Sequence, residues 1–426
     1  MLAWLDPETA LKRGRTPAAE DVAARVAAIL AAVRAEGDEA LVRLTEELDG
    51  AHLTASALEI PGDELEAAWK GLAPDVKRDL ELASSRIEAY HRAQLTGAPA
   101  PVVSGGLSLS ERIEPLARVG FYVPGGTAPL VSTVLMSLVP AVVAGVAERI
   151  LVTPPDAKGR VNAALMGACH LAGATRVFRV GGAQAVAALA FGTAHVPAVE
   201  KVVGPGNRFV TEAKRQVYGH VDIDGLMGPS EVLIVAAGAV DPQWIAWDLL
   251  AQAEHDPLAS AVLVTWDPAL ARRVEPELER LLADLPRREV ARASLSVRGA
   301  VVVVDGPEAA AAFVDAWAPE HAQVMVGDPG LARRVIRGIH RAGALFVGER
   351  VAEAVGDYVA GPSHVLPTGG SARFASGLGV ETFRRRMHVI EARPGPDPEL
   401  LAGAAHLAVL EGLWGHAGSL RARGVA

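Results

Sequence analysis

Short runs of β-branched residues alternate with stretches of helical periodicity along most of this chain. Each run is followed by glycine or proline and then by a segment whose apolar residues recur at helical spacing. Strands that alternate with helices in this way are typical of βαβ units, in which neighbouring strands run parallel. The strand candidates form two groups, 117–123, 149–153, 176–180 and 201–203, and then 231–236, 261–265, 300–304, 323–326 and 344–347. The sequence therefore predicts an α/β fold with two Rossmann-like parallel units.

Three segments differ from this alternation. Residues 21–93 show only helical periodicity, so we expect helices ahead of the first strand. Residues 356–379 are rich in glycine and proline, which predicts a long loop, and long loops in compact proteins are often functional. Residues 399–413 have the apolar spacing of one further helix. That helix either docks on a partner subunit or packs locally.

The composition limits the class of protein and its location. The chain has 426 residues, which is more than one ordinary core, and its net charge of −9 argues against a nucleic-acid partner. Its single cysteine, Cys169, excludes an internal disulfide, and its apolar helical surroundings favour a small buried residue over a nucleophile. Asp6 and Glu8 argue against a signal peptide, and residues 134–146 are too few to span a bilayer. We therefore expect a cytoplasmic protein without a membrane partner, in which residues 134–146 form a core helix.

Two pairs of polar residues could carry chemistry at the ends of predicted elements. Gln252 and His255 stand three residues apart, so both side chains emerge on one face of a helix and could bind a metal. Alternatively, His255 only complements the helix dipole. Glu320 and His321 place a carboxylate beside an imidazole, which suits proton transfer, although Pro319 and Glu320 would also suit the start of a helix.

Four further residues stand in the loop and near the C-terminus. Asp357 and His364 lie in the glycine-rich loop, where they could converge on a metal or substrate, or simply belong to turns. Glu411 and His416 are five residues apart, which is about 140° around a regular helix. These last two would therefore not share a helical face.

Glycine-containing turns follow three of the predicted strands, although none has the Gly-x-Gly-x-x-Gly pattern. They are Tyr122-Val-Pro-Gly-Gly126, Val180-Gly-Gly-Ala-Gln184 and Val203-Gly-Pro-Gly-Asn207. Each opens a helix, whose free backbone N–H groups suit a phosphate. Three such turns in successive units favour a nucleotide cleft, but they do not distinguish NAD from other anions, and each alone could be a tight turn that needs glycine.

Taken together, these segments resemble the histidinol dehydrogenase family over nearly the whole chain, from Val33 to His416. The stretches that carry the resemblance occur in the family's order. They are Arg118–Gly126, Val203–Asn207, Gly228-Pro-Ser-Glu231, Asp248–Pro257, Ala318-Pro-Glu-His321, Gly356-Asp-Tyr358 and His364-Val-Leu-Pro-Thr368.

This resemblance implies a homodimeric zinc enzyme that converts L-histidinol to L-histidine through L-histidinaldehyde and reduces two NAD. The acid–base pair that it implies is Glu320 and His321. The implied zinc ligands are Gln252, His255, Asp357 and His416, the last from the partner chain. The implied substrate contacts are Ser230, Gln252, His255, His321, Asp357, His364, Glu411 and His416, and the implied NAD contacts are Tyr122, Gln184 and Asn207. A site shared between subunits would not require Glu411 and His416 to share a helical face.

The strand pattern and the resemblance together suggest a division into domains. Residues 23–121 and 230–378 are expected to form the domain with the metal and the catalytic residues, and 122–229 the domain with the NAD-binding loops. Residues 1–22 are expected to pack with the C-terminal helices. The extension 379–426 is expected to reach the partner's active site, so that small helical terminal segments exchange between subunits.

The chemistry that the resemblance implies assigns a step to each catalytic residue. His321 takes the hydroxyl proton while a hydride leaves to NAD, and Glu320 then activates water to hydrate the aldehyde. Three places depart from the usual family pattern, namely Met227, Pro362-Ser363 and Trp317. They leave open a related NAD- and metal-dependent dehydrogenase of another small polar alcohol, such as a sulfonated diol. A silent metal- or nucleotide-binding protein is a further alternative, and manganese or cobalt could replace zinc.

Overall fold

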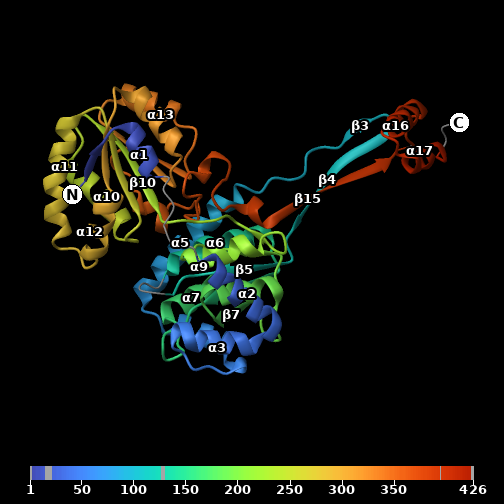
Figure 1. Ribbon diagram of the computed structural model, residues 1–426, viewed down its shortest axis with the longest axis horizontal. Coiled ribbons are helices and arrows are strands. Elements are labelled where there is room, and N and C mark those ends of the chain that lie inside the picture. Colours follow the sequence, from blue (N-terminus) through green and yellow to red (C-terminus); the bar gives the residue numbers. More distant parts are fainter. Residues whose placement is uncertain (1, 15–21, 126–129, 394, 424–426) are drawn as a thin grey trace.

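The computed structural model describes residues 2–14, 22–125, 130–393 and 395–423, which form two α/β units and a projecting arm (Figure 1). Both units contain a six-stranded sheet, and the arm contains a three-stranded one. This confirms the predicted α/β class with two parallel units. No helix in the described ranges is both long and apolar enough to cross a membrane.

The first unit is built on a sheet with the strand order β2-β7-β6-β5-β8-β9. All neighbours in it are parallel except β2, which runs antiparallel to β7. Alternate strand residues face opposite sides: Phe121 and Leu151 pack with α4 to α7, whereas Ile150 and Val152 pack with α2, α3, α8 and α9. The strands are β2 (Glu59–Ile60), β5 (Arg118–Tyr122), β6 (Glu148–Thr153), β7 (Arg176–Arg179), β8 (Lys201–Val203) and β9 (Asp222–Ile223). The helices are α2 (Ala23–Glu36), α3 (Asp38–Asp49), the 3₁₀ turn Ala55–Ala57, α4 (Gly62–Gly71), α5 (Pro74–Arg92), α6 (Val131–Ala144), α7 (Ala163–Leu171), α8 (Gly182–Phe191) and α9 (Arg208–Val217).

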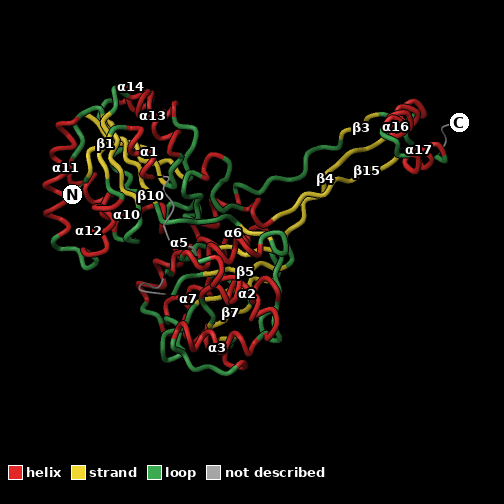
Figure 2. Tube along the Cα trace, in the orientation of Figure 1, coloured by secondary structure: helices red, strands yellow, loops and turns green. Residues whose placement is uncertain are grey.

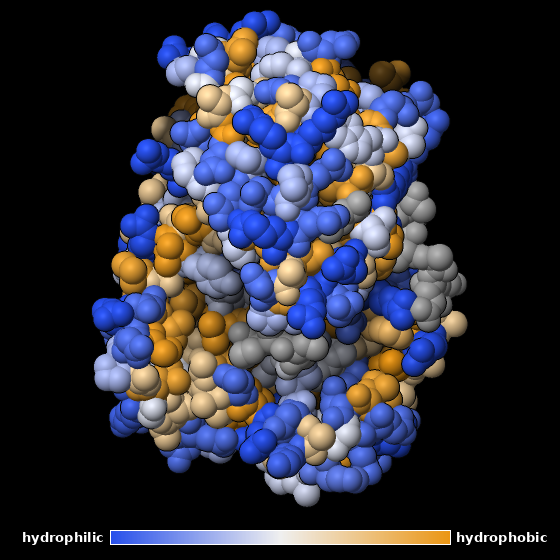
Figure 3. Space-filling model, turned by 90° about the vertical axis from the view of Figure 1, so that its left-hand side faces the viewer, coloured by the Kyte–Doolittle hydropathy of each residue, from blue (hydrophilic) through white to orange (hydrophobic). Residues whose placement is uncertain are grey.

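The second unit has a wholly parallel sheet with the order β1-β12-β11-β10-β13-β14. One face packs against α10, α11 and α12, and the other against α1, α13 and α14. Its strands are β1 (Ala3–Leu5), β10 (Glu231–Ala237), β11 (Ser260–Thr265), β12 (Ala300–Val303), β13 (His321–Val326) and β14 (Ala344–Val347). Its helices are α1 (Pro7–Gly14), α10 (Pro242–Ala253), α11 (Pro268–Leu282), α12 (Arg288–Val297), α13 (Pro307–Trp317) and α14 (Pro329–Gly338). The face shown in Figure 3 is mostly hydrophilic over this unit, at the top, and carries more hydrophobic residues below it.

The arm extends from the first unit as an antiparallel ribbon and ends in two helices (Figures 1 and 2). Its central strand β4 (Leu107–Pro115) pairs with β15 (Arg384–Ala392) along its full length and with β3 (Val102–Ser104). Helices α16 (Pro398–Leu410) and α17 (Trp414–Arg421) form the tip. The predicted helix at 399–413 is therefore confirmed, and it lies far from both α/β cores.

Between β14 and the arm, the chain is mostly irregular, as the glycine and proline content predicts. It contains one short helix, α15 (Ala354–Tyr358), and the 3₁₀ turns Ser371–Arg373 and Val380–Phe383. Residues 134–146 lie largely in the buried helix α6, and Cys169 is fully buried, where burial raises the pKa of its thiol. A buried structural cysteine is thus confirmed.

The expected domain division differs from the packing in the structure for residues 23–121. Residues 23–121 pack on the first sheet, with Val26 and Leu30 in the same core as Ile150, and Val365 and Leu378 from the loop join the core on its other face. The N-terminal segment pairs through β1 with β12 and packs through α1 on α13. Its expected packing with the C-terminal helices, which lie at the arm tip of the same chain, stays a prediction. Helical periodicity shows which face of a helix is buried but not which sheet buries it, so the sequence pattern could not decide this.

Candidate active site

The predicted acid–base pair stands where β13 begins. Helix α13 ends in Ala318, which has φ 55° and is the one non-glycine residue with positive φ among those described. An L-residue in this left-handed region costs about 1–2 kcal/mol, and such strain is often found at functional sites. The turn at Ala318 and Pro319 directs the chain so that Glu320 precedes the strand and His321 opens it. Both side chains are buried.

The backbone of Glu231 anchors both members of the pair. Its N–H donates to Glu320 Oε2 at 3.0 Å, and its carbonyl oxygen lies 3.2 Å from His321 Nδ1. Because a carbonyl can only accept, Nδ1 carries the proton in this hydrogen bond. The imidazole is therefore in the tautomer that leaves Nε2 as the basic nitrogen.

Burial sets the protonation of the two side chains. It raises the pKa of Glu320 well above its ordinary value and lowers the pKa of His321 to about 4. At neutral pH His321 is therefore uncharged and able to accept a proton. In its ionised form, a carboxyl group with a raised pKa is a stronger base, which suits a group that takes a proton from water.

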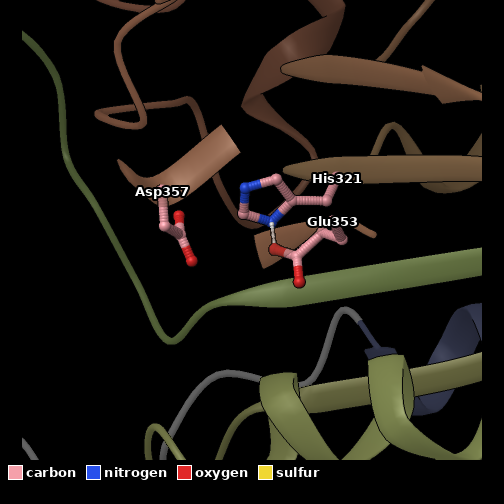
Figure 4. A group of neighbouring side chains, drawn as sticks. All are labelled: His321, Glu353 and Asp357. Atoms are coloured by element: carbon pink, nitrogen blue, oxygen red, sulfur yellow. Dashed lines mark ion pairs between the residues drawn. The ribbon is translucent and has the colours of Figure 1, made fainter. Parts of the chain in front are cut away.

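Helix α15 places two more carboxyl groups beside His321. Glu353 and Asp357 are four residues apart, so they lie on one face of this helical turn. Ligand atoms of His321, Glu353 and Asp357 all lie within 4.8 Å of one another, and Glu353 Oε1 is 3.3 Å from His321 Nδ1 (Figure 4). Sequence reasoning missed Glu353. Its spacing of four residues before Asp357 would have been the signal, but a glycine-rich loop gave no reason to expect a helical turn.

Of the two predicted ligands Gln252 and His255, the first lies in the last turn of α10 and the second in the turn that follows this helix. Gln252 is buried, and its Oε1 atom has no hydrogen-bond partner among the described residues. His255, at the exposed helix end, acts electrostatically on both Asp357 and His321. An unpartnered buried amide oxygen, an imidazole and a carboxylate make a mixed oxygen and nitrogen donor set that fits a divalent metal ion.

His364 connects the site to the first unit. Its Nδ1 atom lies 3.1 Å from the Asp357 carbonyl and 3.5 Å from Asp357 Oδ1, and its Nε2 atom lies 3.2 Å from Thr133 Oγ1 on α6. Although burial opposes ionisation of Asp357, the hydrogen bond from His364 lowers the pKa of that carboxyl group. Asp357 is thus ionised at neutral pH, as a metal ligand must be. Ser230, half-buried, immediately precedes Glu231.

Glu411 and His416 do not join this group within one chain. Glu411 follows α16 and His416 lies on α17, both are exposed, and both helices are at the arm tip (Figure 1). Of the four predicted metal ligands, His416 therefore lies on the arm, whereas Gln252 belongs to α10, His255 to the turn after it and Asp357 to α15. The arm is the part of the molecule that projects furthest from the site.

The predicted nucleotide loops meet at the carboxyl edge of the first sheet. Strand order reverses between β5 and β8, and such a switch point is where open α/β sheets bind ligands. The Tyr122 hydroxyl accepts a hydrogen bond from Gly182 N at 3.2 Å, and Gln184 is fully buried with neither amide atom partnered in the described structure. Asn207 caps α9 through its side-chain oxygen, which accepts from Phe209 N and Val210 N. A Cβ on Gly204 would lie 2.1 Å from the Tyr122 carbonyl, so this close approach requires glycine.

A buried ion pair holds the loop that precedes α9. Lys214 contacts Asp224 Oδ1 and donates to the Gly204 carbonyl at 3.0 Å, and Gly204 N donates to Asp224 Oδ2 at 2.8 Å. Both side chains are almost fully buried. The Lys214–Asp224 pair therefore holds the backbone of the turn at Gly204 in place through hydrogen bonds.

The departures from the family pattern have structural roles in this chain. Trp317 is buried against Gly14 of α1, and its indole hydrogen-bonds to the Glu231 side chain. Ser363 donates to the Met136 carbonyl at 2.9 Å and so ties the loop to α6. The carbonyl of Met227 accepts from Thr211 Oγ1 at 2.7 Å.

Comparison with known proteins gives a consistent result. The family model described as histidinol dehydrogenase matches residues 12–424. The chain is 47% identical over 427 residues to the histidinol dehydrogenase of Moorella thermoacetica, covering 99% of this chain and all of that protein. It is also 47% identical to the histidinol dehydrogenase of Thermus thermophilus, over 96% of this chain and 95% of that one. The crystal structure of histidinol dehydrogenase from Elizabethkingia anophelis superimposes with a TM-score of 0.92 at 32% identity, covering 99% of this chain and 98% of that one.

Proposed function

Because this chain belongs to the histidinol dehydrogenase family, we propose that it oxidises L-histidinol to L-histidine through L-histidinaldehyde. The balanced reaction consumes the alcohol, water and two NAD⁺, and yields the carboxylate, two NADH and three protons. The observation that carries the proposal is the joint anchoring of Glu320 and His321 on the backbone of one residue, Glu231, beside the Asp357 carboxylate. A base and a water-activating carboxyl group are thereby held side by side, as two successive oxidations require.

His321 acts as the base of the first oxidation. Its proton on Nδ1 is held by the Glu231 carbonyl, so Nε2 accepts the hydroxyl proton of the alcohol. NAD, when bound, accepts the hydride, and Tyr122, Gln184 and Asn207 would contact it at the carboxyl edge of the first sheet. The unpartnered amide of Gln184 supplies both a donor and an acceptor for such a ligand.

Glu320 acts in the hydration step. It takes a proton from water as the oxygen attacks the aldehyde carbon, and His321 then assists the second hydride transfer by accepting the hydroxyl proton of the hydrate. The aldehyde stays bound between the two oxidations, which prevents its release.

Gln252, His255 and Asp357 would hold a zinc ion together with the partner subunit's His416. When bound, the ion would serve as a template that positions the substrate's imidazole and amine. Ser230, His364 and Glu411 would contact the substrate around it. Manganese or cobalt would suit the same donors, so the native metal is to be measured.

The protein would be a homodimer with shared active sites. Two observations support a dimer. Glu411 and His416 lie at the end of the arm, and the arm leaves large apolar side chains uncovered. Among them are Leu407, Leu410 and Trp414, which are 63%, 83% and 64% exposed. A second copy of the chain that covers these residues would bring both polar side chains to its site. The cytoplasmic location stays a prediction from the sequence.

The proposed function is tested by measuring how many NADH molecules are formed for each histidinol consumed. Purified protein with zinc, NAD and L-histidinol should produce two NADH for each histidinol consumed. One NADH for each alcohol, or no turnover of histidinol while a sulfonated diol is oxidised, would contradict the proposal.

The Glu320→Gln variant tests the assignment of the second step. It should still oxidise histidinol to the aldehyde but be slowed most when supplied with histidinaldehyde, because hydration then lacks its base. The Glu349→Gln variant, in the turn after β14, is the matched control. Wild-type rates from both substrates in the Glu320→Gln enzyme would defeat the assignment.

A further inference from the structure

We infer that Glu353 is a positioning residue for His321, a role that rests on the proposed function of that histidine. Glu353 is buried, immediately precedes α15 and directs its carboxyl group to the Nδ1 side of the ring (Figure 4). Its Oε1 atom lies 3.3 Å from Nδ1, beside the Glu231 carbonyl oxygen that accepts from that nitrogen at 3.2 Å. The hydrogen bond to Glu231 fixes the tautomer, and the buried carboxyl group of Glu353 at this distance limits the rotation of the ring.

The surroundings make this contact rigid. The His321 ring lies against Phe346, with centroids 6.0 Å apart. A Cβ on Gly356 would lie 2.7 Å from Phe346 Cζ, so α15 packs directly on the same aromatic ring. Phe346 therefore packs against both α15 and the imidazole of His321, and it sets the distance between the helix that follows Glu353 and the ring.

The contact depends on the shape of the Glu353 side chain and on the position of its oxygen atoms, since both Glu353 and His321 are buried. A carboxylic acid keeps an acceptor oxygen when it is protonated. An amide of the same shape should therefore replace it better than a hydrocarbon.

Helix α15 also connects the base to the proposed metal site. Asp357 stands one turn after Glu353, so the residue that would hold the ion and the residue that orients the base belong to one short rigid element. The family motifs do not reveal the role of Glu353, since this residue lies before the Gly356-Asp-Tyr358 stretch.

The test compares Glu353→Leu with Glu353→Gln in the zinc-loaded full-length enzyme. A misoriented base costs up to about 100-fold in rate, so we expect Glu353→Leu to lower kcat by about that factor while KM for histidinol and the zinc content change less than about twofold. Glu353→Gln should lose about tenfold less than Glu353→Leu. Glu349→Leu serves as the control for introducing leucine nearby.

A double variant decides whether Glu353 acts through His321. If it does, His321→Asn with Glu353→Leu should have the same kcat as His321→Asn alone, whereas a general structural role would multiply the two losses. Multiplied losses, an unchanged kcat in Glu353→Leu, or equal losses in the Leu and Gln variants would overturn the inference. If His321→Asn alone keeps wild-type kcat, the proposed function of His321 fails instead.

Discussion

The shared active site makes a quantitative prediction for hybrid dimers. In the proposed arrangement each site combines Glu320 of one chain with the partner subunit's His416. A hybrid of one Glu320→Gln chain and one His416→Asn chain then has one site with both defects and one site with neither. Its expected activity is about half that of the wild-type dimer, because one of the two sites is intact.

The reciprocal hybrid gives the opposite result. When one chain carries both substitutions and the other is wild type, each site receives one defect, so the activity should fall to that of the single variants. Sites built within one chain would reverse the two outcomes. The position of α17 at the end of the arm, away from Asp357, is the structural reason for the first pattern.

The assay uses two differently tagged chains that are co-expressed and purified by both tags in sequence, so that only hybrids are collected. NADH production with saturating histidinol, NAD and zinc gives the activity per dimer. Near-zero activity of the first hybrid together with half activity of the second would refute the shared site. A monomeric protein by sedimentation would refute it as well.

Three further predictions concern stability and ligand binding. In chemical denaturation, Lys214→Met should lower the free energy of unfolding by about 3–5 kcal/mol, because Asp224 is left buried without its partner, and the variant should also raise KM for NAD. Lys12→Met, in the exposed pair with Glu8, should change the free energy of unfolding by less than about 1 kcal/mol. Equal effects of the two variants would contradict the role of burial. Gln252→Leu should release zinc during dialysis that leaves the wild type loaded, as measured by metal analysis, and retained zinc would exclude its amide oxygen as a ligand. Burial raises the pKa of Asp49 to about 6, so the contribution of its protonated form to stability is complete below about pH 4 and is lost as pH rises through 6. Asp49→Asn should therefore raise Tm at pH 8 but not at pH 3.5. A gain in Tm at pH 3.5 alone would show that the pKa of Asp49 is not raised by folding.

The sequence predicted the strands of the two units because each is a compact β-branched run between turn residues. Strand β10, seven residues that are all buried, is the clearest case. The short edge strands β1, β2 and β9 were not predicted, since two or three residues carry no periodicity. The arm strands β4 and β15 were missed for another reason. They are largely exposed and polar, so their pairing depends on each other and not on a core.

The candidate site was predictable where motifs mark single residues and not where the fold creates a contact. Glu320, His321 and Asp357 stand in recognisable stretches, and the structure brings them together. The hydrogen bonds to Glu231 depend on the register between β10 and β13, which pairs Val232 with His321. Thr133 contacts His364 only because the loop crosses from one unit to the other. Neither register nor domain placement can be inferred from local spacing.

The backbone of Glu231 has a kinetic consequence. Its donor and its acceptor each hold one of the two side chains that serve the successive oxidations. A displacement of the Glu231 backbone by an ångström would misalign both together, so variants that disturb the start of β10 should depress the alcohol and aldehyde rates in parallel. Only substitutions of the side chains themselves can separate one half-reaction from the other.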